Sequence, residues 1–137
     1  MSFTLSDQMN AKEYNELRIA VGFKPLTGKQ AERGLLHTTF LVAARDGDEC
    51  GGMGRVLFDY GYTAYIGDII VRPDHQGQGI GKAIVEKLIQ QTREAADSGD
   101  RIMFVLAAAK GKEEFYEKLG FERQPSESLG HGMVMWV

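Results

Sequence analysis

The sequence is poor in several features that define large classes of protein. Only one of its 137 residues is a cysteine, so no disulfide can form within the chain, and a lone thiol is typical of a reducing compartment. The net charge of -3 offers no general attraction for nucleic acid or for an anionic membrane. No apolar run approaches the roughly 20 residues that a membrane-spanning helix needs. Any anion must therefore be bound at a local site.

The N-terminus also lacks the basic region and the apolar core of a signal peptide. We therefore expect a cytoplasmic protein with no membrane or nucleic-acid partner. Neither repeats nor a low-complexity linker interrupts the chain, and its length suits one domain. We expect a single domain over residues 1–137.

Capping, turn and periodicity signals predict an alternation of helices and strands. The predicted helices span residues 11–21, 28–36, 79–98 and 112–119. The predicted strands span residues 40–44, 50–58, 64–71, 102–107 and 132–137, with room for a short strand near residues 3–5. Three strands in a meander lead into one strand–helix–strand unit, which predicts an α+β fold with α/β/α layers.

What the chain has in abundance is glycine. Its 17 glycines are roughly twice the average usage of about 7%. Several follow the strand predicted at 64–71, where residues 71–82 read Val-Arg-Pro-Asp-His-Gln-Gly-Gln-Gly-Ile-Gly-Lys. Glycine lets the backbone approach a ligand closely, and the first N–H groups of the following helix have no internal partner. This arrangement predicts a phosphate-binding loop that needs no net positive charge.

Two common phosphate motifs do not fit this loop. A P-loop would need glycine at position 76 and serine or threonine at 83, where the chain has Gln76 and Ala83. A dinucleotide fingerprint would need glycine at 82, where the chain has Lys82. A general nucleotide-phosphate binder would bind ATP or NAD at this loop, and the spacing argues against it.

Residues 76–81, Gln-Gly-Gln-Gly-Ile-Gly, fit the pattern Gln/Arg-x-x-Gly-x-Gly/Ala. Here the chain resembles the GNAT superfamily of N-acetyltransferases. Residues 115–121, Phe-Tyr-Glu-Lys-Leu-Gly-Phe, are similar to a late helix of that family. The resemblance extends over about residues 40–123. It implies a mixed, mostly antiparallel sheet with a central splayed pair of parallel strands, flanked by helices.

The resemblance also implies a function and a site. The chain would transfer an acetyl group from acetyl-CoA to a primary amine of a small molecule or peptide, with no metal. Tyr116 would protonate the departing thiolate, and the loop at 76–82 would bind the pyrophosphate. The backbone at 69–71 would pair with the pantetheine arm and stabilise the oxyanion. The implied cofactor-binding residues are Ile69, Ile70, Val71, Gln76, Gly77, Gln78, Gly79, Ile80, Gly81, Lys82 and Tyr116.

The general base has several candidates. Asp68 precedes the cofactor-binding stretch and could accept the proton directly or through a water molecule. Its alternative role is a structural carboxylate that caps loops or pairs with a basic group. His131 and Tyr65 are further candidates, whereas we expect His75 to be solvated. Cys50 has no obvious base beside it and is interpreted as a strand residue.

The acceptor is left open. Arylalkylamines, polyamines, peptide N-termini and lysine side chains all remain possible, and the expected acceptor pocket contains Arg18, Phe23, Arg55, Tyr60, Tyr62 and Tyr65. Ala109 stands where many relatives have an asparagine that contacts the cofactor, so that contact is either missing here or made instead by Lys110 or Lys112. A homodimer is plausible by the same resemblance. The alternative function is a non-catalytic acyl-CoA-binding regulatory module of the same fold.

Overall fold

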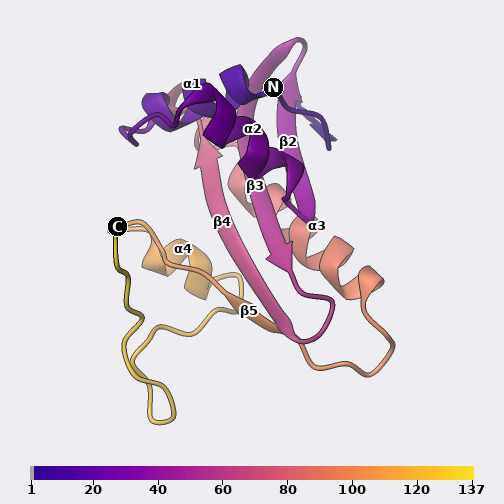
Figure 1. Cartoon of the computed structure of the whole chain (residues 1–137), viewed down its shortest axis with the longest axis vertical. Helices are drawn as coiled ribbons and strands as arrows, with labels where there is room; N and C mark the ends of the chain where they lie inside the picture. The colour runs from indigo at the N-terminus through magenta and orange to yellow at the C-terminus, as the bar shows by residue number, and fades with distance from the viewer. Residues whose placement is uncertain (1) are drawn as a thin grey trace. The chain divides into compact units, whose positions relative to one another are not determined.

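The computed structural model describes residues 2–137 and divides at Val105 into two compact units, each described here by itself. The first unit contains β1 (Thr4–Ser6), α1 (Ala11–Ala20), α2 (Gly28–Leu36), β2 (Phe40–Asp46), β3 (Glu49–Phe58), β4 (Thr63–Val71), the 3-10 turn η1 (Pro73–His75), α3 (Ile80–Ala95) and β5 (Met103–Val105) (Figure 1). The second unit contains the short helix α4 (Glu113–Glu117). None of the helices in the described part of the chain is long and apolar enough to cross a bilayer.

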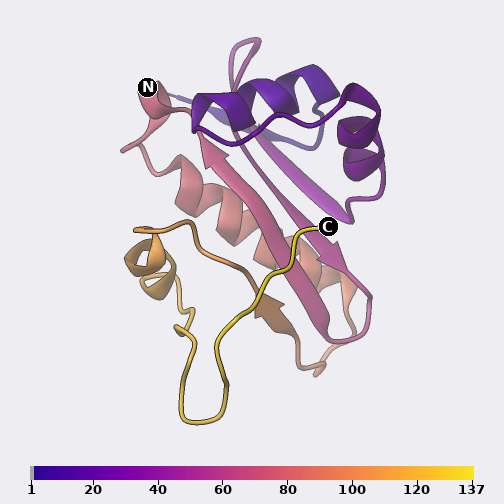
Figure 2. The same cartoon turned by 60° about the vertical axis from the view of Figure 1, so that its left-hand side comes forward.

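The five strands form one sheet in the order β1-β2-β3-β4-β5. The first four pair antiparallel, and β4 and β5 pair parallel after the chain has passed through α3. Helix α3 packs along one face of the sheet, and α1 packs with α2 on the other (Figure 2). The mixed sheet flanked by helices confirms the predicted fold class.

Each face of the sheet has its own core. On the α1 face, Tyr14 and Leu17 pack with Met53 of β3 in one buried cluster. On the α3 face the helix lies very close to the sheet. A Cβ at Gly54 of β3 would lie 2.6 Å from side-chain atoms of both Ile69 and Ile84. Only glycine at this position lets α3 approach β3 so closely.

The two N-terminal helices begin where their caps were predicted. Asn10 and Glu13 form a reciprocal capping box at the start of α1. The Thr27 hydroxyl accepts the N–H of Gln30 at 3.1 Å at the start of α2. Glu13 also binds Arg45 of β2 at 2.8 Å, so that the same side chain that caps α1 ties it to the sheet.

Strand β4 contains a β-bulge at Asp68. Met53 pairs with Ile70 but Arg55 pairs with Gly67, so that β4 has one residue more than β3 between these pairs. Asp68 has a φ of 52°, in the left-handed region that an aspartate tolerates better than most residues. The extra residue turns the Asp68 side chain to the α1 face.

Several predictions differ from the structure. Residues 132–137 form no strand, because a strand needs a partner and they have none among residues 2–137; Met133 to Val137 are exposed instead. The strand predicted at 102–107 shortens to Met103–Val105. Helix α3 ends at Ala95, because the Asp100 carboxylate accepts the N–H of Asp97 at 3.1 Å and stabilises a turn in place of another helical turn.

Candidate functional site

Strand β4 has an unpaired edge next to the glycine loop. Its pairing with β5 ends at Tyr65 and Val105, and β4 continues to Val71 with no further strand partner on that edge in the described chain. The N–H of Arg72 donates to the carbonyl of Gly51 on β3 at 2.8 Å. Since backbone groups alternate in direction along a strand, Val71 turns its N–H and C=O to the open edge. These are polar backbone groups that a ligand can pair with.

The glycine loop presents further free donors. Gly77 and Gly79 have φ values of 81° and 79°, and neither has an atom within 4 Å of where a Cβ would lie. Helix α3 begins directly after Gly79, and its first turn closes with the N–H of Ala83 on the Gly79 carbonyl at 3.1 Å. The N–H groups of residues 80–82 therefore have no partner within residues 2–137. Open space and free donors at a positive helix end suit an anion.

Gln76 links this loop to the open edge of β4. Its side-chain amide donates to the carbonyl oxygen of Val71 at 3.0 Å. The side chain of Gln76, one of the predicted cofactor-binding residues, is thus already hydrogen-bonded within the protein. It holds the loop at the end of β4. The predicted cofactor-binding residues 69–71 and 76–82 lie together in the first unit.

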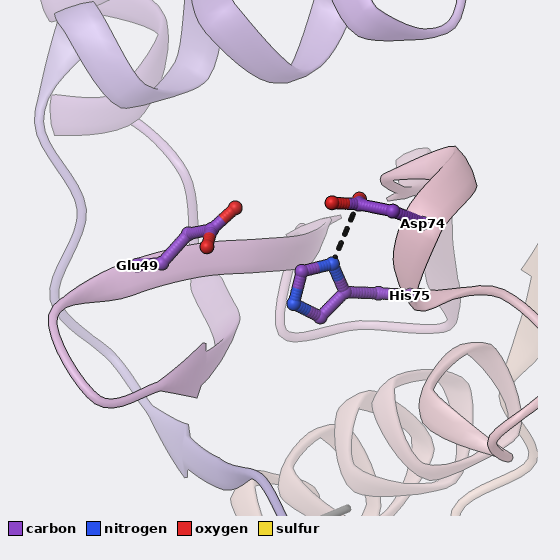
Figure 3. Close-up of side chains that lie close together, drawn as sticks. All are labelled: Glu49, Asp74 and His75. Atoms are coloured by element: carbon purple, nitrogen blue, oxygen red, sulfur yellow. Dashed lines mark hydrogen bonds and ion pairs between the residues drawn. The ribbon is translucent and has the colours of Figure 1, made fainter.

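His75 is buried, contrary to our expectation that it is solvated, with 5% of its surface exposed. Its Nδ1 lies 2.9 Å from Asp74 (Figure 3). Its Nε2 lies 3.7 Å from Asp46 of β2. The absence of a side chain at Gly51 makes room for the ring, since a Cβ there would lie 2.9 Å from it. The imidazole therefore anchors the start of the glycine loop to the β2–β3 end of the sheet.

Glu49, Asp74 and His75 bring their donor atoms within 4.8 Å of one another, a spacing compatible with a metal ion (Figure 3). Arg72, however, already places its Nε 3.2 Å from Glu49 and 3.7 Å from Asp74. A guanidinium thus supplies the positive charge between these carboxylates. We assign the cluster to ion pairing that holds the loop.

Asp68, the candidate base, lies in a network of three donors. Its Oδ2 accepts the Tyr14 hydroxyl and, at 2.8 Å, the Nε of Arg55, while its Oδ1 accepts the Nη1 of Arg18 at 3.2 Å. Burial, together with the bond to Asp68, raises the pKa of Tyr14 to about 12, so that this phenol remains a donor. These contacts are those of a carboxylate paired with basic groups. The three donors leave one of the roughly four acceptor positions of the carboxylate free.

Tyr116 lies on α4 in the second unit. Burial raises the pKa of its phenol to about 12. The ring makes edge contacts with Phe115 and Phe121, with centroid distances of 4.9 and 5.9 Å. Ala109 is exposed, and its carbonyl accepts the N–H of Lys112 at the start of this helix at 2.9 Å.

The other candidates have simpler surroundings. His131 is exposed, and Tyr65 exposes 43% of its surface on β4. Cys50 is a buried strand residue whose pKa burial raises, which favours the unreactive thiol. Sequence reasoning missed Tyr14 and His75 as parts of the site. Tyr14 has the spacing of a core residue on α1, and no local signal distinguishes it from one.

Comparison with known proteins agrees with this geometry. Residues 37–123 match the model of the acetyltransferase (GNAT) domain family. An uncharacterized N-acetyltransferase, ycf52, from Porphyra purpurea is 31% identical over 126 residues, which cover 89% of this chain and 70% of the relative. The histone acetyltransferase TAP1 of Glycine max is 45% identical over 79 residues, which cover 58% of this chain but only 32% of that protein.

Solved structures show the same fold over the full length. A probable acetyltransferase of unknown function, SA2161, from methicillin-resistant Staphylococcus aureus superposes with a TM-score of 0.87 and 31% identity. The match covers 99% of this chain and 100% of that one. With a family match over more than half of its length and relatives that share both sequence and fold, the chain belongs to the GNAT family of acetyltransferases.

Proposed function

We propose that this chain transfers an acetyl group from acetyl-CoA to a primary amine of a small molecule or peptide. The observation that supports the proposal most is the continuity of two features, the open edge of β4 and the free N–H groups at the start of α3, joined by a loop with two left-handed glycines. A pyrophosphate at such a helix start and an amide-containing arm along such an edge suit the two halves of coenzyme A.

Each part of the loop has a role in binding. Residues 76–82 hold the pyrophosphate through backbone N–H groups, and Gln76 keeps the loop in register with Val71. The backbone of residues 69–71 pairs with the pantetheine arm. One N–H of this stretch faces the thioester oxygen, which gains negative charge as the amine attacks. A thioester is already activated, so positioning supplies much of the rate.

Two side chains move protons in this proposal. Tyr116 donates a proton to the departing thiolate, and its raised pKa keeps the phenol protonated at neutral pH. Asp68 accepts the proton of the attacking amine, directly or through a water molecule, with Tyr14 and the two arginines adjusting around it. An ordinary thiol has a pKa of about 8.5, so this phenol is a weaker acid than the thiol it would form, and the proposal requires bound acetyl-CoA to lower the pKa of Tyr116.

The test is amine-dependent release of free thiol from acetyl-CoA, with the acetylated product identified by its mass. We expect release to require an amine and to fall about 100-fold or more in Tyr116→Phe, which lacks the proton donor. A protein that binds acetyl-CoA but releases no thiol with any amine would instead fit the regulatory acyl-CoA-binding module.

A further inference from the structure

The α1 face of the sheet has an excess of positive charge beside β4. Arg18 of α1 and Arg55 of β3 both pair with the single carboxylate of Asp68, and their side chains expose 17% and 22% of their surface. Tyr14, the third group bonded to Asp68, stays neutral because its pKa is about 12. No other carboxylate of residues 2–137 forms an ion pair with either arginine, so the cluster has a net charge of about +1.

Both arginines keep a free donor group. Arg18 donates its Nε to the Lys24 carbonyl at 2.9 Å, and Arg55 donates an Nη1 proton to the Thr38 hydroxyl at 3.2 Å. Neither Nη2 has a hydrogen-bond partner in the part of the chain that the structure describes. Neither is among the buried atoms left without a partner, so each is accessible to water. These nitrogens can donate to a ligand without breaking an existing bond.

The two guanidinium groups are also held in place. Their central carbons lie 6.0 Å and 5.8 Å from the centroid of the Tyr14 ring, and Arg18 lies 5.6 Å from that of Phe23. Arginines fixed by carboxylate and aromatic contacts lose little conformational entropy when they bind an anion. The two guanidinium groups are thus already positioned to bind an anion.

An apolar surface adjoins the charged cluster. Leu57 and Tyr65 are paired across β3 and β4 and expose 42% and 43% of their surface. Leu57 lies two residues from Arg55, so both side chains point to the same face of the sheet. An acceptor that extends from the arginines along this face would meet both charged and apolar groups.

We propose that Arg18 and Arg55 bind an anionic group, a carboxylate or a phosphate, on the acceptor, so that this enzyme prefers amines that also have such a group and an apolar side chain. This inference rests on the proposed function, because Asp68 directly precedes the backbone assigned to the thioester. An anion at the arginines would lie beside the reacting amine. Guanidinium groups bind carboxylates and phosphates through matched pairs of N–H donors.

The test compares amines that differ only in the anionic group. Thiol release is measured with phenylalanine against phenethylamine for the carboxylate, and with 2-aminoethylphosphonate against propylamine for the phosphate-like group. We expect the anionic member of one pair to have at least a tenfold higher kcat/KM, and Arg55→Gln to reduce that ratio at least tenfold. Arg33→Gln, an exposed change on α2, should leave the ratio within twofold. Equal kcat/KM values within both pairs would overturn the inference and leave the proposed function intact.

Two further measurements keep the test decisive if Arg55→Gln does not fold or if no amine is acetylated. Circular dichroism melting shows whether Arg55→Gln is folded, and Arg18→Lys replaces it if not. If no amine is turned over, the proposed function fails, and titration with 3-phenylpropionate, observed by NMR, tests the arginines alone. Binding to the wild type that Arg55→Gln weakens at least fivefold would still support an anion site; equal binding by both would exclude one.

Discussion

At the residue scale, Tyr116 combines an apolar setting with a titratable group. Two phenylalanine rings contact it edge-on, and burial raises its pKa to about 12. A phenol in such a setting is protonated throughout the physiological range, which a proton donor requires. The same contacts would also hold a phenylalanine in place.

Tyr116→Phe should therefore lower the rate of acetyl transfer while leaving acetyl-CoA binding almost unchanged. We expect kcat to fall about 100-fold or more, the usual contribution of a general acid, with acetyl-CoA affinity changed less than threefold. Because the phenol of the free chain has a pKa of about 12, kcat/KM of the wild type should show no loss from this group below about pH 10. Stopped-flow thiol release between pH 6 and 10 provides the measurement. An unchanged kcat in the folded variant would remove Tyr116 from the mechanism.

Asp68 is the carboxylate that forms ion pairs with the guanidinium groups of Arg18 and Arg55. Asp68→Asn removes the charge that pairs with Arg18 and Arg55 and should lower the free energy of unfolding by about 1–3 kcal/mol, since bonds to charged groups are lost but the site is partly solvated. Urea denaturation measures this, with Asp48→Asn, an exposed change, as the control. A variant as stable as the control would mean that the ion pairs contribute nothing to folding.

These residues also show where sequence reasoning ends. The type and spacing of residues 76–81 predicted a loop at a helix start, because backbone conformation there follows directly from glycine. The burial of His75 depends on Gly51, a residue 24 positions earlier that lies beside it only after the sheet has formed. Likewise, the partners of Asp68 come from α1 and β3. Contacts of this kind follow from the tertiary fold and leave no local signal.

At the scale of single elements, the glycine loop has conformations that other residues rarely adopt. Gly79 has a φ of 79° but open space around its α-carbon, so an added methyl group costs only backbone strain. Gly79→Ala should destabilise the chain by about 1 kcal/mol and weaken acetyl-CoA binding at least tenfold, because the donors at the start of α3 shift. Calorimetry and thermal unfolding measure the two effects.

Gly34→Ala is the matched control for that change. Gly34 lies inside α2, has no positive φ and has no atom within 4 Å of a new Cβ. Alanine should therefore stabilise the helix by about 0.5–1 kcal/mol and leave binding unchanged. If both alanine variants bind acetyl-CoA like the wild type, the loop has no special role in binding.

The ion pair between Glu13 of α1 and Arg45 of β2 makes the stability of the fold depend on pH. The hydrogen bond from Arg45 lowers the pKa of Glu13, so its stabilising effect is complete above the unfolded value of about 4.3 and is lost as the pH falls through the folded pKa. Glu13→Gln keeps a side chain suited to the capping box. We expect its free energy of unfolding to fall less steeply than that of the wild type between pH 5 and 3. Parallel slopes in urea titrations would contradict this.

Elements were predicted where their signals are local. The caps at Asn10 and Thr27 and the turn signals that bound β3 and β4 suffice for four elements, because caps and turns are visible in the sequence. The strand predicted at 132–137 is absent. Strand formation requires an unpaired edge elsewhere, and the sequence does not show whether one is in reach.

At the scale of the whole molecule, fold and family agree. The parallel pair β4–β5 in an otherwise antiparallel sheet, the family match over residues 37–123 and the full-length superposition on a probable acetyltransferase all point to one architecture. The net charge of -3 means that any affinity for a pyrophosphate arises locally, from backbone groups at one helix start. A cytoplasmic location, one domain over residues 1–137 and a homodimer remain predictions.

The most direct test of the central claim is a calorimetric titration of the full chain with acetyl-CoA, with ATP and NAD as controls under the same conditions. Our account predicts one acetyl-CoA per chain with a micromolar dissociation constant, and at least 100-fold weaker binding of both controls. Absence of acetyl-CoA binding, or equal binding of all three nucleotides, would contradict it, and the glycine loop would then be no more than a structural turn into α3.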